Sequence, residues 1–193
     1  SKVTGYKIKD LDFPRTAIIG GVIKDGKGII ALGDYKISAG DRIPEISLTT
    51  MTNEGPTPVS FTDLFAGKRV ALFAVPGAFT PTCSQEHLPG FVNQAEQLTD
   101  KGIDTVACIS VNDVFVMDAW GKSQGADGKV LMLADGNGEF TAALGLELDA
   151  SGFGMGSRSQ RFSLVANDGV IEILNVEAGG FEVSSCEYML EQI

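Results

Sequence analysis

Short apolar runs of strand length recur through most of the chain. They lie at residues 69–75, 104–111, 130–134, 161–166 and 170–176. The first three are almost continuously apolar, which is typical of strands buried on both faces of a sheet. The last two flank Asn167-Asp168-Gly169, a turn sequence that predicts a β-hairpin.

Helical periodicity fills the segments between these runs. Apolar side chains recur on one helical face at Leu88, Phe91, Val92, Ala95 and Leu98. This helix is expected to end at the basic-then-glycine pair Lys101-Gly102, and Pro89 is expected to kink it or break its hydrogen-bond ladder. Further helices are predicted from the capping pair Asn112-Asp113 onward, over residues 138–144, and from residue 184 to the end. The alternation of strands and helices predicts an α/β fold with a mixed central sheet flanked by helices.

The N-terminal segment has a different pattern. Residues 17–32 hold two β-branched apolar runs around Asp25-Gly26, which predicts a hairpin. The stretch LDFPRTAIIGGVIKDGKGIIALGD weakly resembles the β-rich C-terminal regulatory domain of potassium-uptake proteins, although too little of that domain is present to form it. We therefore expect a β-rich hairpin extension over residues 1–36, packed on the body or on a neighbouring subunit, and a main domain over residues 37–193.

Length and composition fit one globular domain with an appendage. The chain has 193 residues, of which 44% are hydrophobic and 21% charged. Its formal net charge of −10 argues against partners that need a basic surface, so neither nucleic acid nor an anionic membrane is expected to bind. No apolar run approaches the roughly 20 residues of a membrane span, and the N-terminal SKVTGYKIKD has no apolar signal core. A cytoplasmic protein is therefore expected.

Cysteine and histidine are scarce. The three cysteines, Cys83, Cys108 and Cys186, cannot all pair, and they form neither a CxxC motif nor a metal-ligand cluster. With His87 as the single histidine, a histidine-rich zinc site is also excluded, and we expect no metal and no cofactor. The missing CxxC disfavours a thioredoxin-like disulfide reductase. Three free thiols indicate either thiol chemistry or inert buried cysteines.

Cys83 stands in VPGAFTPTCSQEH, residues 75–87, between a predicted buried strand and a predicted helix. Unpaired N–H groups at a helix start favour an anion, and the carboxyl edge of an open α/β sheet is where ligands bind. Because a free thiol has a pKa of about 8.5 and the thiolate is the nucleophile, a catalytic cysteine also needs a cation nearby. Free cysteine is just as often a small core residue. However, Pro76, Thr80 and Pro81 make this approach stiffer than a core cysteine requires.

The motif P-G-A-F-T-P-T-C over residues 76–83 resembles the Pro-x-x-x-Thr-x-x-Cys signature of peroxiredoxins, which are thiol peroxidases of thioredoxin-like fold. The segments SQEHLPGF, ISVNDVFVMDAWGK and ADGNGEF that follow resemble the type II, or atypical two-cysteine, subgroup. The similarity extends from about residue 37 to the C-terminus. It implies an enzyme that reduces hydrogen peroxide and organic hydroperoxides in antioxidant defence.

The resemblance also implies roles for individual residues. Cys83 corresponds to the peroxidatic cysteine that becomes a sulfenic acid, Thr80 to the threonine that faces it, and Pro76 to the proline that shields the pocket from water. The family brings an arginine to this cysteine from a distant strand. In GSRSQRFSLV, Arg161 matches it best, with Arg158 as a supporting second. Arginine keeps its charge and offers fixed donors, which suits a thiolate and a peroxide.

The remaining candidates are His87 and the two other thiols. His87 follows Cys83 on the same helical face, where a Cys–His nucleophile pair is conceivable, but the resemblance favours a packing and hydrogen-bonding role. Cys108 has the spacing of the resolving cysteine in plant-type members, and Cys186 lies near the animal-type position. A disulfide needs Cα atoms within about 7 Å, so either route is expected to require unwinding. An external thiol is a third option, and thioredoxin or glutathione with glutaredoxin is the expected reductant.

Two functions compete for these residues. One is peroxidase turnover through Cys83, and the alternative is a redox sensor or relay that passes oxidation to partner thiols. Because the subgroup commonly dimerises near its active site, a homodimer or higher homo-oligomer is expected. Phe115, Trp120 and Phe153 are candidate contacts, with a role as core residues as the alternative. The glycine-rich GFGMGSR over residues 152–158 lacks the spacing of a dinucleotide fingerprint and is expected to be a flexible loop.

Overall fold

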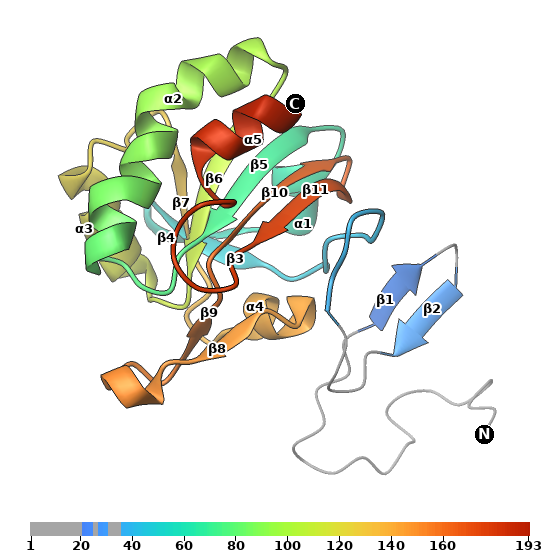
Figure 1. Cartoon of the computed structure of the whole chain (residues 1–193), viewed down its shortest axis with the longest axis horizontal. Coiled ribbons are helices and arrows are strands. Elements are labelled where there is room, and N and C mark those ends of the chain that lie inside the picture. The colour runs from blue at the N-terminus through green and yellow to red at the C-terminus, as the bar shows by residue number, and fades with distance from the viewer. Residues whose placement is uncertain (1–20, 25–26, 31–35) are drawn as a thin grey trace.

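The structure, a computed structural model, describes residues 21–24, 27–30 and 36–193 (Figure 1). A mixed sheet forms its centre, in the order β11-β10-β5-β6-β7-β3-β4. Its strands are β3 (Leu48–Thr52), β4 (Gly55–Val59), β5 (Arg69–Ala74), β6 (Thr105–Ser110), β7 (Leu131–Ala134), β10 (Phe162–Asn167) and β11 (Val170–Val176). Strands β5, β6 and β7 are parallel, and the other pairings are antiparallel. The predicted mixed α/β fold of thioredoxin type is confirmed.

Helices cover both faces of this sheet. They are α1 (Phe61–Phe65), α2 (Leu88–Asp100), α3 (Val114–Ser123), α4 (Glu139–Leu144) and α5 (Cys186–Gln192). Side chains of β5 alternate between two cores, with Phe73 packed among residues of α2, α3 and α5, and Leu72 among residues of α1 and α4. The sheet is therefore buried on both sides, which explains why the sequence of β5 is almost continuously apolar.

Two small hairpins stand apart from the main sheet. Strands β8 (Glu147–Asp149) and β9 (Ser157–Ser159) pair around a 3₁₀ turn, η3 (Ser151–Phe153). Strands β1 (Gly21–Lys24) and β2 (Lys27–Ile30) pair antiparallel, as the hairpin pattern predicts. The rest of the proposed extension lies outside the described residues, and the division at residue 36 stays a prediction.

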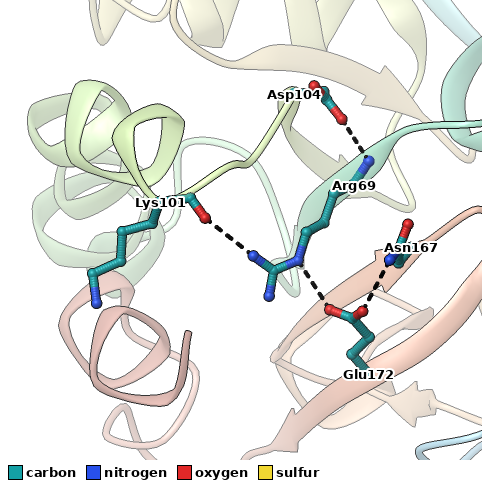
Figure 2. A network of polar contacts seen from close by, with 5 residues as sticks. All are labelled: Arg69, Lys101, Asp104, Asn167 and Glu172. Carbon is teal, nitrogen blue, oxygen red and sulfur yellow. Dashed lines mark hydrogen bonds and ion pairs between the residues drawn. The ribbon is translucent and has the colours of Figure 1, made fainter.

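Arg69 ties together the end of the sheet from which β5 starts (Figure 2). Its backbone N–H donates to Asp104 Oδ2 at 2.7 Å, at the entry to β6, and its side chain donates to Glu172 Oε2 on β11 at 2.9 Å and to the Lys101 carbonyl at 3.1 Å. Asn167 Nδ2 donates to the other oxygen of Glu172 at 3.1 Å. This network fixes three strands at the end remote from Cys83, which follows the opposite end of β5. None of the helices in the described ranges is long and apolar enough to cross a membrane.

Candidate active site

Cys83 lies in a π-helical turn, η2 (Cys83–His87), that leads directly into α2. The Leu88 N–H donates to the Cys83 carbonyl, five residues back, and Pro89 follows without an N–H of its own. The predicted break at Pro89 is therefore present, and it takes the form of a wide turn. This turn buries both of its functional side chains, Cys83 and His87.

Arg161 reaches the thiol from the neighbouring strand. Its Nη2 donates to Cys83 Sγ at 3.4 Å. The register of the sheet explains the approach, because Phe162 at the start of β10 pairs with Ala74 at the end of β5. Antiparallel pairing thus places the residue before β10 beside the loop after β5. The guanidinium is therefore a fixed positive charge and a fixed hydrogen-bond donor beside the sulfur.

His87 holds the other end of the same guanidinium. Its Nδ1 lies 3.0 Å from Arg161 Nη1, and its Nε2 lies 3.0 Å from the Ser184 carbonyl. Arginine can only donate and a carbonyl can only accept, so Nδ1 is the acceptor and Nε2 carries the proton. Burial, reinforced by the Arg161 charge, lowers the pKa of His87 from an ordinary 6.5 to about 3. The imidazole is therefore neutral, and both of its nitrogens are engaged in orienting Arg161 and Ser184.

The segment between β11 and α5 closes over this group, although no sequence pattern predicts it. The Phe181 ring packs 5.7 Å from the Arg161 guanidinium and 5.0 Å from the His87 ring. Glu177 Oε1 accepts hydrogen bonds from the backbone N–H groups of Glu182 and Ser184 at 2.7 and 2.8 Å. Burial raises the pKa of Glu177, but these hydrogen bonds and the Arg161 charge outweigh it and lower the pKa overall. Glu177 thereby fixes Ser184, whose carbonyl accepts the hydrogen bond from His87 Nε2.

Thr80 and Pro76 lie in the loop between β5 and the helical turn. The Thr80 hydroxyl donates to the Gly77 carbonyl at 2.8 Å, which leaves its oxygen lone pairs for a donor in the site. Pro76 is half-buried at the start of the loop. Between them, Phe79 adopts a φ of 62°, a left-handed conformation that bulky residues rarely take. The stiff approach expected from the two prolines is thus also a strained one.

Arg158 does not contact Cys83. Its Nε donates to the Met155 carbonyl and its Nη1 to the Val111 carbonyl, both at 2.8 Å. These bonds join the β8–β9 hairpin to the end of β6. Arg158 therefore supports the frame around the loop, and the arginine at the thiol is Arg161.

Cys108 and Cys186 are both buried and unpaired. Cys108 lies in β6 opposite Phe73 of β5, and burial, followed by the proximity of Cys83, raises the pKa of its thiol. Cys186 begins α5, and burial together with Glu187 raises its pKa to about 12. A Cβ added to Gly90 of α2 would lie 3.9 Å from Cys186 Cβ, so α5 packs closely on α2 here. Both thiols are protonated near neutral pH.

Known proteins resemble this chain over the main domain. The family described as Redoxin matches residues 38–190. Peroxiredoxin-2E, chloroplastic, of Arabidopsis thaliana is 53% identical over 163 residues, which cover 81% of this chain and 69% of that protein. Peroxiredoxin-2C of Oryza sativa subsp. japonica is 50% identical over 159 residues, covering 81% and 98%. The crystal structure of reduced Prx3 from Vibrio vulnificus in complex with H₂O₂ superimposes with a TM-score of 0.78 at 53% identity, covering 81% and 98%. The chain belongs to the peroxiredoxin family of thiol peroxidases, beside its type II members.

Proposed function

We propose that Cys83 is the peroxidatic cysteine of a peroxidase that reduces hydrogen peroxide and organic hydroperoxides. The thiolate attacks one peroxide oxygen, the O–O bond breaks, and the leaving oxygen takes a proton to become water or an alcohol. Cys83 is thereby oxidised to a sulfenic acid. The observation that carries this proposal is the 3.4 Å hydrogen bond from Arg161 to Cys83 Sγ. The similarity to Vibrio vulnificus Prx3, whose reduced form was crystallised in complex with H₂O₂, supports hydrogen peroxide as a substrate.

Each of the residues around Cys83 has a separate role in the displacement. Arg161 stabilises the thiolate and the charge that develops on the peroxide oxygens, as fixed donors do at other reacting centres. The Thr80 oxygen faces the substrate as an acceptor for its O–H, and Pro76 keeps water from the thiolate. His87 keeps the guanidinium oriented through its 3.0 Å contact. None of these steps requires His87 to accept a proton from the thiol.

The sulfenic acid is then reduced by a second thiol, with loss of water and formation of a disulfide. Cys186 lies on a two-turn terminal helix, whereas Cys108 lies in β6 between β5 and β7. Exposing Cys186 requires α5 to leave α2, but exposing Cys108 requires the centre of the sheet to open. We therefore favour Cys186 over Cys108 as an internal resolving cysteine, with an external thiol as the competing route. Thioredoxin or glutathione with glutaredoxin completes the cycle.

Two experiments test the two parts of this scheme, first the oxidation of Cys83 and then its reduction. The reduced protein is treated with one equivalent of hydrogen peroxide, trapped with dimedone, and digested for mass spectrometry. Adducts on Cys83 support its role, and adducts confined to another cysteine contradict it. Steady-state turnover of Cys108→Ser and Cys186→Ser with each reductant then identifies the resolving thiol. If neither variant loses turnover, an external thiol reduces Cys83 directly, and rapid oxidation without turnover by any reductant would instead favour a redox relay.

A homodimer is proposed through the surface around the active site. Three phenylalanine side chains are exposed, with Phe79 57%, Phe115 65% and Phe153 86% accessible. Phe79 belongs to the active-site loop, and Phe153 lies in the hairpin that Arg158 joins to Val111. Large apolar side chains exposed on the surface are typical candidates for subunit contacts. Trp120, a further candidate for these contacts, is instead fully buried and donates to Ser84 Oγ at 3.0 Å.

The cytoplasmic location stays a prediction, because chloroplastic proteins are among the relatives.

A further inference from the structure

Asn112 connects the end of β6 to the active-site loop. Its Oδ1 accepts a hydrogen bond from the Ala78 N–H at 3.0 Å. The same oxygen lies 2.8 Å from the hydroxyl of Ser110, which is fully buried and also lies 3.0 Å from the Val75 carbonyl. The sequence predicts Asn112-Asp113 as a helix cap, but Asp113 alone caps α3, by accepting from the Val116 N–H at 2.9 Å. The Asn112 side chain is directed to the loop instead.

The hydrogen bond between the Ala78 N–H and Asn112 lies next to the strained residue of the loop. Ala78 directly precedes Phe79, whose φ is 62°, and Phe79 directly precedes Thr80. A strained residue keeps its conformation only when its surroundings fix it. From the other side, a Cβ added to Gly77 would lie 3.0 Å from the Met155 methyl carbon and 3.2 Å from the Thr80 methyl carbon. The loop is thus held between the β8–β9 hairpin and Asn112.

We propose that Asn112 is a positioning residue that sets the orientation of Thr80 for peroxide attack at Cys83. The inference rests on the role proposed above for Cys83. It adds that the amide of Asn112 acts through Ala78 on Thr80, and not through the thiol. The hydrogen bonds of Arg161 to Cys83 and His87 do not include Asn112. The effect of Asn112 on peroxide attack is therefore separable from thiolate stabilisation.

The separation predicts that Asn112 affects one reaction of the Cys83 thiol and leaves another nearly unchanged. Asn112→Ala removes the acceptor and should slow the single-turnover reaction with hydrogen peroxide by about 10- to 100-fold, as small misplacements of reacting groups do. Alkylation of Cys83 by iodoacetamide needs no Thr80 and should change by no more than about twofold. Asn112→Asp keeps an oxygen acceptor and should recover most of the peroxide rate. Asn93→Ala, on the exposed side of α2, is the matched control and should change neither reaction.

A double-mutant cycle tests whether Asn112 acts on peroxide attack through the Thr80 hydroxyl. In a Thr80→Val background, Asn112→Ala should slow the peroxide reaction by no more than about a further twofold, because the hydroxyl that it positions is already absent. Equal losses in peroxide reaction and alkylation would overturn the proposal, as would full additivity with Thr80→Val. Circular dichroism identifies a variant that fails to fold, and Asn112→Gln, which keeps an amide but displaces the acceptor, then takes the place of Asn112→Ala. Failure of the Cys83 assignment is distinguishable, since Cys83→Ser would then retain peroxide reactivity.

Discussion

Arg161 Nη2 donates to Cys83 Sγ at 3.4 Å, although 78 residues separate them in the sequence. The antiparallel pairing of Phe162 with Ala74 brings them together. His87 Nδ1 accepts a hydrogen bond from Nη1 of the same guanidinium at 3.0 Å. This second hydrogen bond fixes the orientation of Nη2, which faces the sulfur. The position of the cation is therefore built into the register of the sheet and the π-helical turn.

The planar shape of the Arg161 guanidinium, and not only its charge, is expected to speed peroxide attack at Cys83. Arg161→Lys keeps the charge but cannot bridge Cys83 and His87 with a rigid fork, so the rate constant for peroxide attack should fall by about 10²-fold. Stopped-flow fluorescence of the reduced protein measures this constant. Arg69→Lys is the matched control, because Arg69 lies at the opposite end of β5 (Figure 2). Equal rates for Arg161→Lys and the wild-type protein would show that charge alone suffices.

Acid should destabilise the protein through His87. Its pKa is lowered from 6.5 to about 3 on folding, so the unfolded chain binds a proton that the folded chain does not between these values. Titration of His87 therefore leaves the free energy of unfolding unchanged above about pH 6.5 and lowers it progressively as the pH falls toward 3. At about pH 4 the loss should reach about 3 kcal/mol.

Urea unfolding of the wild-type protein and of His87→Gln across this pH range measures the difference. The glutamine variant should be less stable near neutral pH but should lose less stability on acidification. Parallel curves for the two proteins would show that folding does not lower the pKa of His87. Carboxylates titrate in both proteins and cancel in the comparison.

The three thiols should differ in reactivity. Cys83, which accepts a hydrogen bond from Arg161, should be alkylated first by iodoacetamide at about pH 8. Cys108 and Cys186 should remain unmodified until the protein is unfolded, because burial raises the pKa of both, that of Cys186 to about 12. Mass spectrometry of time points assigns each adduct. Labelling of Cys186 as fast as Cys83 would show that α5 detaches readily from α2.

The exposed phenylalanines should control self-association. Phe115→Glu and Phe153→Glu would each place a charge in the proposed contact, and the dimer should dissociate with little change in thermal stability. Sedimentation velocity over a range of protein concentrations measures the effect. Tyr188→Glu, at an exposed position on α5, is the control. A dimer that persists in both phenylalanine variants would place the contact elsewhere on the chain.

The sequence predicts the elements whose signal is local. The apolar run of β5, the stripe of α2 and the hairpin of β10 and β11 are all predictable, the last because Asp168 and Gly169 both take positive φ. The peroxiredoxin motif singles out Cys83 and Thr80, and the family arginine points to Arg161. A local pattern also indicates the break at Pro89, though not that it would be a π-helical turn.

The missed features depend on contacts between distant segments. Ser184, which accepts from His87, and Asn112, which accepts from Ala78, are polar residues in loops with no periodic signal. The sequence leaves Trp120 as either a subunit contact or a core residue, and the packing of α3 against the sheet makes it a core residue. Such roles are set by which loops the sheet brings together, and no spacing along the chain records them.

The most direct test of the role of Cys83 is steady-state consumption of hydrogen peroxide by the wild-type protein and by Cys83→Ser, each with a thiol reductant. Cys108→Ser, which replaces the disfavoured resolving thiol and leaves Cys83 in place, should retain turnover with an external thiol reductant. Cys83→Ser is predicted to consume no peroxide above the rate of reductant alone. Substantial turnover by Cys83→Ser would contradict this role and would assign the chemistry to another thiol.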